Sequence, residues 1–187
     1  MDAGGDFSAY QNFDSSLAPG VDWWSNNNGV PAAFYNSTSA TIDAFNTVVL
    51  EPYQFLLHPD GDVSSSARWT SPSAGYYSFS WTFVGQDTHG PATGATGVDV
   101  YLNGVSVWGG SISGFQFTAS GSNVYELNAG DVLDFTVNHG NGSFPNDYYW
   151  DSTGLAATVT NAVPEPGSLL ALGVGLFAFA PFIRRQR

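Results

Sequence analysis

Three short segments of this sequence combine aromatic side chains with neighbouring carboxylate or amide groups. They are Asp99, Tyr101 and Trp108; Tyr148, Tyr149 and Trp150 within residues 146–151; and, as a weaker candidate, Trp23 and Trp24. An aromatic ring stacks on the apolar face of a sugar ring, and carboxylates or amides bind sugar hydroxyls. These side chains are therefore candidate ligand-binding residues. The alternative for each segment is that its rings only pack within the fold.

The histidines and aspartates give a weaker indication of a metal site. His58, His89 and His139 are widely separated and the chain has no cysteine, so we expect neither a zinc site nor a disulfide. Four aspartates in expected loops have the oxygen ligands that calcium prefers: Asp60, Asp62, Asp147 and Asp151. Their spacing is not that of an EF-hand. A structural calcium ion therefore stays open, and no other cofactor is expected.

No arrangement of residues indicates catalysis. The segment 110–114 has the spacing of a nucleophile elbow, but Ile112 stands where the serine would be. A glycosidase needs two carboxylates about 5–10 Å apart, a geometry that sequence spacing in a strand-rich protein does not reveal. We therefore expect a protein that is not an enzyme, with a glycan hydrolase as the less favoured alternative.

The elements that must position these residues are predicted to be β-strands. From Gly75 onward, Tyr77, Phe79, Trp81 and Phe83 alternate with polar residues, which predicts a strand with one buried face. The dipeptide Asn103-Gly104 predicts a tight hairpin between residues 98–102 and 105–107. Further strands are expected at 123–127, 131–137 and 155–160, and within 41–50 and around Tyr35.

The hairpin turn also predicts a register. Leu102 should pair with Val105, and the pairs after it should be Tyr101 with Ser106, Val100 with Val107 and Asp99 with Trp108. The valines and Leu102 would then face inward, whereas Asp99, Tyr101 and Trp108 would face outward. In the strand at 131–137, we expect Leu133, Phe135 and Val137 inward and Asp134 and Thr136 outward.

Short strands separated by turn signals, with no helix before residue 163, predict an all-β fold. We expect residues 1–162 to form one antiparallel β-sandwich, followed by a separate C-terminal segment. The chain has 16 acidic residues against four arginines and a net charge of −12, which excludes nucleic acid as a partner. Its aromatic content of 16% argues against a disordered chain.

The C-terminal segment 163–187 differs sharply from the body. Residues 167–183 carry no charge and would reach about 25 Å as a helix, the lower limit for crossing a bilayer. The three arginines that follow, Arg184, Arg185 and Arg187, predict that this end stays in the cytoplasm. We therefore expect a single transmembrane helix with the body on the opposite side of the inner membrane. The alternative is an apolar helix buried in the fold.

Val163, Pro164, Glu165 and Pro166, followed by this apolar segment and its arginines, resemble the PEP-CTERM sorting signal of Gram-negative bacteria. The resemblance implies recognition by an exosortase and delivery to the cell surface or the extracellular matrix. Residues 1–6 show no secretory signal, although such proteins normally carry one, so we expect a leader upstream of Met1. Without a leader, the body would stay in the cytoplasm.

The order of several segments between residues 57 and 155 resembles a jelly-roll module of bacterial surface proteins. The segments are 57–59, 68–77, 98–104, 127–135 and 151–155. Such modules are similar to carbohydrate-binding domains, so the resemblance implies a jelly-roll-like sandwich that binds polysaccharide, such as exopolysaccharide. The alternative is a structural or adhesive matrix protein that associates with itself, with or without calcium.

Overall fold

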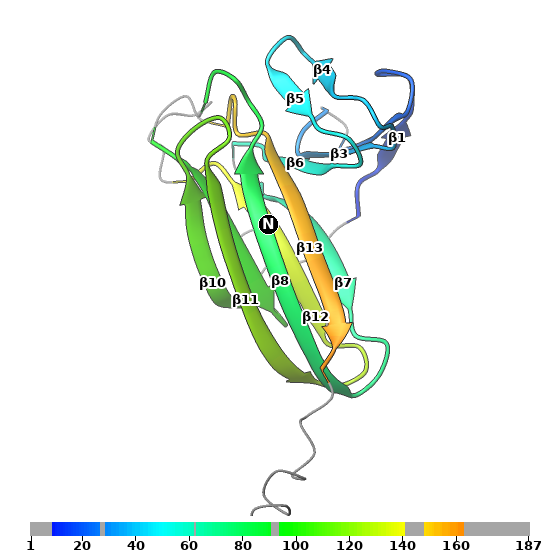
Figure 1. The fold of residues 1–187 in the computed structure, drawn as a ribbon, viewed down its shortest axis with the longest axis vertical. Coiled ribbons are helices and arrows are strands. Elements are labelled where there is room, and N and C mark those ends of the chain that lie inside the picture. The colour runs from blue at the N-terminus through cyan, green and yellow to red at the C-terminus, as the bar shows by residue number, and fades with distance from the viewer. Residues whose placement is uncertain (1–8, 27–28, 62, 91–93, 141–147, 163–187) are drawn as a thin grey trace, which may run out of the picture.

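The structure is a computed structural model and describes residues 9–26, 29–61, 63–90, 94–140 and 148–162. Within these residues it contains strands β1 to β13 and no helix (Figure 1). The first six strands are β1 (Asn12–Asp14), β2 (Val21–Ser25), β3 (Ala32–Asn36), β4 (Ile42–Ala44), β5 (Val48–Leu50) and β6 (Phe55–His58). The others are β7 (Ser65–Thr70), β8 (Gly75–Gly85), β9 (Thr96–Leu102), β10 (Val105–Ile112), β11 (Thr118–Leu127), β12 (Val132–Asn138) and β13 (Thr153–Asn161).

The strands form two facing sheets and one small hairpin, all antiparallel. The larger sheet has seven strands in the order β1-β2-β3-β6-β13-β8-β11, and the smaller has four in the order β10-β9-β12-β7. From β7 to β13 the chain passes repeatedly between the two sheets, as in a jelly-roll. Figure 1 shows β8, β11 and β13 as the front layer, with β1 to β6 gathered at one end. The prediction of an antiparallel all-β sandwich is confirmed.

The core between the sheets follows the predicted alternation of β8. Phe79 and Phe83 are fully buried, and Tyr77 and Trp81 are almost so. The facing sheet contributes apolar side chains from β9 and β12: Val98, Val100, Leu133, Phe135 and Val137. These residues have the inward orientation that the sequence predicted.

Two polar residues of β12 differ from expectation in their burial. Asp134 and Thr136 lie on the outer face of the sheet as predicted, but both are buried. Arg68 on the neighbouring strand β7 pairs with Asp134 through two hydrogen bonds of 2.6 and 2.7 Å. A buried carboxylate is unfavourable without a partner, and the guanidinium of Arg68 provides one for Asp134. The outer face of this sheet is therefore more enclosed than the sequence indicated.

The predicted register of the β9–β10 hairpin is right near the turn and wrong beyond it. Val105 pairs with Leu102 and Ser106 pairs with Tyr101, but a bulge at Val107 then pairs Trp108 with Val100. The extra residue reverses the faces of the strand beyond this point. Trp108 therefore points inward and stacks on Phe83, with ring centroids 6.0 Å apart and planes at 5°.

The burial predicted for the two valines of β10 is also wrong. Val105 and Val107 were expected to face inward, yet both are exposed. The bulge accounts for Val107, whereas Val105 precedes it, keeps its predicted partner Leu102 and lies next to the turn at the end of the sheet. Asp99 is opposite Gly109 rather than Trp108 and stays on the outer face with Tyr101. The predicted group of Asp99, Tyr101 and Trp108 is consequently divided between the two faces of the sheet.

The N-terminal strands enclose a second, smaller core beside the sandwich. It contains Val21, Ala32, Phe34, Ala44, Val48, Leu50 and Leu56. The predicted strands within 41–50 are confirmed as the β4–β5 hairpin. Backbone bonds from Val49 N to Gln86 O and from Thr88 N to Thr47 O, both 2.8 Å, attach this hairpin to the chain beyond β8. The hairpin is therefore fixed next to one end of the sandwich.

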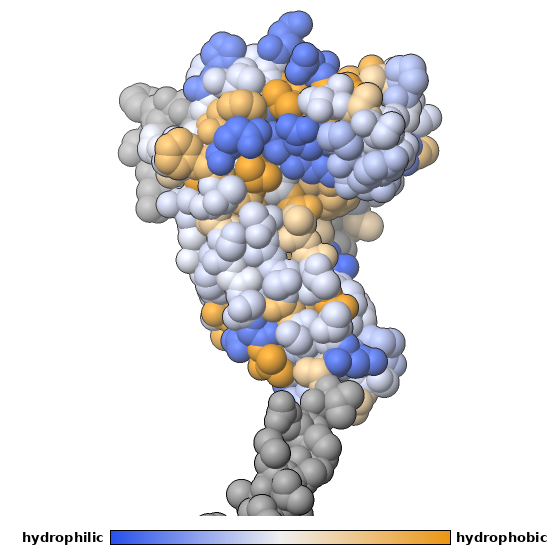
Figure 2. Space-filling model, in the orientation of Figure 1, coloured by the Kyte–Doolittle hydropathy of each residue, from blue (hydrophilic) through white to orange (hydrophobic). Residues whose placement is uncertain are grey.

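The exposed face of the larger sheet carries small hydroxyl side chains. They are Ser78, Ser80 and Thr82 on β8, Ser120 and Ser122 on β11, and Thr158 and Thr160 on β13. Figure 2 shows this part of the surface as mostly pale, of intermediate hydropathy. Apolar and strongly hydrophilic residues lie side by side nearer the ends of the molecule, including the end formed by the N-terminal strands.

The C-terminal end of β13 lies far from the N-terminal strands along the sheet. Asn161 pairs with Tyr77 near the start of β8, whereas Thr153 pairs with Gly85 at the end of β8 (Figure 1). The sorting motif 163–166, the expected membrane helix 167–183 and the three arginines lie outside the described residues. In the described part of the chain, no helix is long and apolar enough to cross a membrane.

Candidate ligand-binding cleft

A cleft of about 420 Å³ lies where the N-terminal strands and the β4–β5 hairpin meet the end of the sandwich. Its aromatic lining residues are Trp23, Phe34, Phe45, Tyr149 and Trp150. Its polar lining residues are Thr47, His58, Asp87 and Ser152. These side chains come from segments that are far apart in the sequence, so only the folded chain brings them together.

The inner wall is an aromatic pair positioned by strand register. Trp23 on β2 is opposite Phe34 on β3, and their rings stack with centroids 5.8 Å apart and planes at 13°. Phe45 from the β4–β5 turn meets both rings edge-on, at 6.4 Å from Trp23 and 6.0 Å from Phe34. The indole Nε1 of Trp23 is buried and has no hydrogen-bond partner in the described residues.

Two aromatic residues at the rim have an unusual backbone conformation. Phe45 has φ of 52° and Trp150 has φ of 69°, and their side chains are 54% and 40% exposed. The left-handed region costs an L-residue roughly 1–2 kcal/mol, and such strain is concentrated at binding sites. The fold therefore holds two exposed rings at the cleft on strained backbone.

The outer wall is a run of stacked rings. Tyr149 stacks on Tyr148 at 4.8 Å, and Trp150 stacks on His89 at 5.5 Å with planes at 17°. Tyr148 also meets His58 edge-on at 6.3 Å. The expectation that at least one ring of this segment is exposed is confirmed, because Tyr149 and Trp150 are both exposed.

Asp87 is the acidic residue of the cleft and is only 3% exposed. Its carboxylate accepts hydrogen bonds from Thr47 Oγ1 at 3.2 Å and from the backbone N–H of His89 at 3.1 Å. Burial raises the pKa of Asp87, while these hydrogen bonds and the nearby imidazole of His89 act in the opposite direction. A buried carboxylate with unused lone pairs can accept a hydrogen bond from a hydroxyl group of a ligand.

His58 also lines the cleft and is neutral at pH 7. Burial lowers its pKa from 6.5 to about 4, although the negative charge of Asp60 opposes this shift. His58 Nδ1 is 3.1 Å from Ser152 Oγ, so one atom donates to the other. The cleft thus combines aromatic rings with a few hydrogen-bonding groups and carries little positive charge.

The burial of His58 predicts an effect of acid on stability. Unfolded His58 binds a proton below pH 6.5, whereas the folded side chain resists protonation until about pH 4, so acid favours the unfolded state. Between pH 7 and 4.5 this residue should remove about 2–3 kcal/mol from the free energy of unfolding. Denaturant titrations of the wild type and of His58→Gln measure this contribution.

The comparison isolates His58 because other titrating groups are common to both proteins. Asp87, whose pKa is raised by burial, favours the folded state as the pH falls and would partly mask the effect in the wild type alone. A His58→Gln protein that loses stability with acid as steeply as the wild type would contradict the prediction.

The structure brings together residues from two of the three predicted groups. Trp23 and the pair Tyr149 and Trp150 line the same cleft. Trp24 points to the opposite face of β2, because successive residues of a strand alternate. Asp99 and Tyr101 are elsewhere, on the outer face of the smaller sheet.

Asp99 lines a separate, glycine-rich hollow of about 600 Å³. Burial raises the pKa of Asp99, and Asn138 Nδ2 donates to its carboxylate at 2.9 Å. Gly109 is opposite Asp99 on β10, and a Cβ there would lie 2.8 Å from the carboxylate. No aromatic ring lines this hollow within the described residues, so it lacks the stacking surface that a sugar site needs.

The sequence analysis did not identify Phe34, Phe45, Thr47 or Asp87. Each lies in a segment that looks like ordinary strand or turn sequence. The signal that was available is Phe45-Asn46 between two apolar strands, since asparagine indicates a left-handed turn. Nothing in the sequence indicates that this turn approaches Asp87.

Of the four aspartates considered for calcium, the structure describes Asp60 and Asp151. Asp151 is buried and accepts a hydrogen bond from Thr96 Oγ1 at 2.5 Å, while Asp60 accepts one from the backbone of Gly61. Asp62 and Asp147 lie outside the described residues. In the part of the chain that is described, no cluster of three or more acidic, histidine or cysteine side chains could hold a metal ion. Calcium remains a prediction.

Comparison with known proteins bears first on the C-terminus. Residues 162–187 match the description "PEP-CTERM protein-sorting motif". The chain carries a PEP-CTERM sorting signal. This confirms the resemblance noted at 163–166 and indicates a protein that is exported and processed by an exosortase.

The sandwich has solved structures similar to it at low sequence identity. One is CBM51 from Clostridium perfringens GH95 in complex with methyl-galactose, with 17% identity, a TM-score of 0.42 and coverage of 68% of this chain and 87% of that chain. A second is CBM51-2 in complex with GlcNAc and INT domains from Clostridium perfringens ZmpB, with 14% identity, a TM-score of 0.43 and coverage of 88% and 43%.

A third similar structure is Pika GITRL, with 16% identity, a TM-score of 0.33 and coverage of 51% of this chain and 76% of that chain. No curated protein matches the sequence. Similarity at this level does not determine what a sandwich binds, because one fold supports many functions.

Proposed function

We propose that this protein is an exported, non-enzymatic module that binds neutral polysaccharide in the cleft at the end of its sandwich. The observation that carries the proposal is the set of rings around the cleft, two of which are exposed on left-handed backbone. Aromatic faces of this kind bind the C–H faces of sugar rings. The volume of about 420 Å³ lies within the usual range for ligand sites, roughly 300–1,000 Å³.

The polar groups of the cleft support a neutral sugar. Asp87, Thr47 and Ser152 offer oxygen atoms to hydroxyl groups, and the unpartnered Nε1 of Trp23 offers a donor. The net charge of −12 and the neutral His58 disfavour an anionic polymer. The ligand that suits this cleft therefore has alternating apolar and hydroxyl surfaces and no negative charge.

The sorting signal indicates where in the cell the protein would act. In this proposal residues 167–183 hold the precursor in the inner membrane, with Arg184, Arg185 and Arg187 in the cytoplasm. An exosortase then cuts near Pro164, Glu165 and Pro166, and the body is delivered to the cell surface or the extracellular matrix. Polysaccharide binding there would retain the released protein.

The test of binding is affinity electrophoresis in gels containing galactan, mannan or another neutral polymer, supported by a glycan array. We expect the wild type to be retarded and Trp150→Ala to be retarded much less, with roughly tenfold weaker binding for the loss of one stacking ring. Tyr53→Ala is the matched control, since Tyr53 is 62% exposed and has φ of 56° but does not line the cleft.

Two results would count against the proposal. One is a wild-type protein that no neutral polysaccharide retards, including a protein that only an acidic polysaccharide retards. The other is equal retardation of the wild type and Trp150→Ala, which would place any binding outside this cleft.

A self-associating matrix protein is the second candidate. It is favoured by the outer face of β8, β11 and β13, whose hydroxyl side chains let molecules of high negative charge approach each other there. Sedimentation velocity at increasing concentration, with and without a calcium chelator, separates the two candidates. A monomer under all conditions removes this one.

A further inference from the structure

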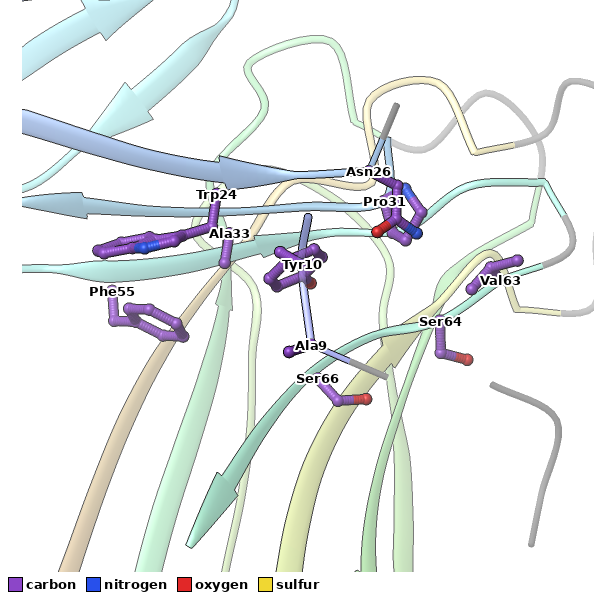
Figure 3. Close-up of a pocket in the computed structure, with 10 residues that line it drawn as sticks. All are labelled: Ala9, Tyr10, Trp24, Asn26, Pro31, Ala33, Phe55, Val63, Ser64 and Ser66. Atoms are coloured by element: carbon purple, nitrogen blue, oxygen red, sulfur yellow. The ribbon is translucent and has the colours of Figure 1, made fainter. Parts of the chain in front are cut away.

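A second cleft lies on the reverse side of the strands that form the first. Trp23 is opposite Phe34 and the next pair, Trp24 and Ala33, is on the other face of the same two strands. Trp24 and Ala33 line a hollow of about 360 Å³, similar in size to the first cleft (Figure 3). The two clefts therefore open on opposite faces of the β2–β3 ribbon.

The second cleft also has aromatic walls. Its rings are Tyr10, Trp24 and Phe55, which come from three separate segments of the chain. In the view of Figure 3, Trp24 and Phe55 lie toward one end and Val63 toward the other, with Tyr10 between them. None of the described residues that line this cleft is charged, so it fits a neutral ligand.

The hydroxyl groups here are arranged to meet a polar ligand. Ser65 Oγ donates to the backbone oxygen of Ala32 at 2.7 Å, so it must accept from Tyr10 OH, which lies 2.5 Å away. The Tyr10 oxygen also accepts from the backbone N–H of Ser66, which leaves one lone pair for a ligand, and burial raises the pKa of Tyr10. The bond from Ser65 to Ala32 O thus fixes the direction of the bond between Tyr10 and Ser65.

Ser66 provides an independent indication of a ligand. This residue lines the cleft and is 8% exposed, yet its Oγ has no hydrogen-bond partner in the described residues. A buried hydroxyl without a hydrogen-bond partner destabilises the folded protein. A ligand hydroxyl that bonds to Ser66 Oγ would offset this destabilisation, whereas an apolar occupant would not.

We propose that the second cleft binds another chain of the same class of neutral polysaccharide, which makes each molecule bivalent. The proposal rests on the function proposed for the first cleft. Because the clefts open on opposite faces of one ribbon, each would hold its own polymer segment. One molecule would then cross-link two chains, and binding to a polymer would gain from both sites.

The test is isothermal titration calorimetry of the full chain with short oligosaccharides of galactan, mannan and chitin, each used alone. We expect the wild type to bind two equivalents of oligosaccharide. The Trp24→Ala variant should bind one, and so should the milder double variant Tyr10→Phe/Ser66→Ala. Trp150→Ala should also bind one, and a protein changed in both clefts should bind none. Tyr53→Ala should bind two.

Light scattering with the parent polymer tests the cross-linking. The wild type should give scattering that rises and then falls with protein concentration, and either single-cleft variant should bind without raising the scattering. If the wild type binds only one equivalent of oligosaccharide, and Trp150→Ala abolishes that binding, bivalence is overturned and the proposed function stands. No binding of any oligosaccharide by any protein would overturn both.

A third result would assign the second cleft to another occupant. If the full chain binds one equivalent and a variant lacking residues 1–8 binds two, the leading segment of the chain occupies the cleft in the native protein. That outcome would also overturn the proposal.

Discussion

Replacing Phe45 by alanine or by glycine should weaken polysaccharide binding about tenfold in both cases, yet the glycine variant should be the more stable by about 1 kcal/mol. Both changes remove a ring that is 54% exposed and meets Trp23 and Phe34 at the cleft. Only glycine also relieves the positive φ of 52°. The two variants therefore separate the contribution of the ring from that of the backbone.

Affinity electrophoresis measures the binding, and denaturant titration measures the free energy of unfolding. Tyr53→Ala and Tyr53→Gly form the matched control, because Tyr53 has φ of 56° and lies outside the cleft. The Tyr53 pair should show the same difference in stability and no loss of binding. Unchanged binding by both Phe45 variants would show that this ring does not contact the polymer.

Replacing Pro164 and Pro166 together by alanine should abolish processing and leave uncleaved protein in the membrane fraction. Proline cannot continue a helix, so in the proposed mechanism these two residues would keep the motif extended and accessible to the exosortase. With alanine at both positions, the helix proposed for residues 167–183 would be able to extend through the motif and make the bond to be cut inaccessible. Cell fractionation and immunoblotting in a host with an exosortase measure the outcome.

Pro181→Ala is the control for this experiment, since it removes a proline from the apolar segment and leaves the motif intact. We expect this variant to be processed as the wild type is. Normal release of the Pro164→Ala/Pro166→Ala protein would remove the motif from the sorting mechanism, whatever the body binds.

The sequence predicted strands well where one side-chain pattern decided the outcome. The alternation of β8 has a single solution, because shifting it by one residue would expose Phe79 and Phe83. The bulge in β10 could not be predicted from the turn. There, packing of Trp108 on Phe83 and near Trp81 favours an inward indole, and one extra residue in the strand allows it.

Part of the cleft could also be predicted from a local side-chain pattern. Consecutive aromatic residues at 148–150 cannot all point inward, so exposure of some of them follows from the sequence. Their partners depend on contacts between distant segments, such as the bond from Val49 N to Gln86 O that holds the β4–β5 hairpin in place. No local pattern contains that information.

The position of Ala162 has a consequence for the precursor before it is cut. Its backbone N–H donates to Tyr76 O near the start of β8, whereas Asp87 of the cleft lies two residues beyond the end of that strand. An extended strand of this length covers roughly 35 Å at about 3.3 Å per residue. If the precursor is anchored in the membrane through its tail and binds glycan as proposed, this length would separate the cleft from the anchored end of the domain.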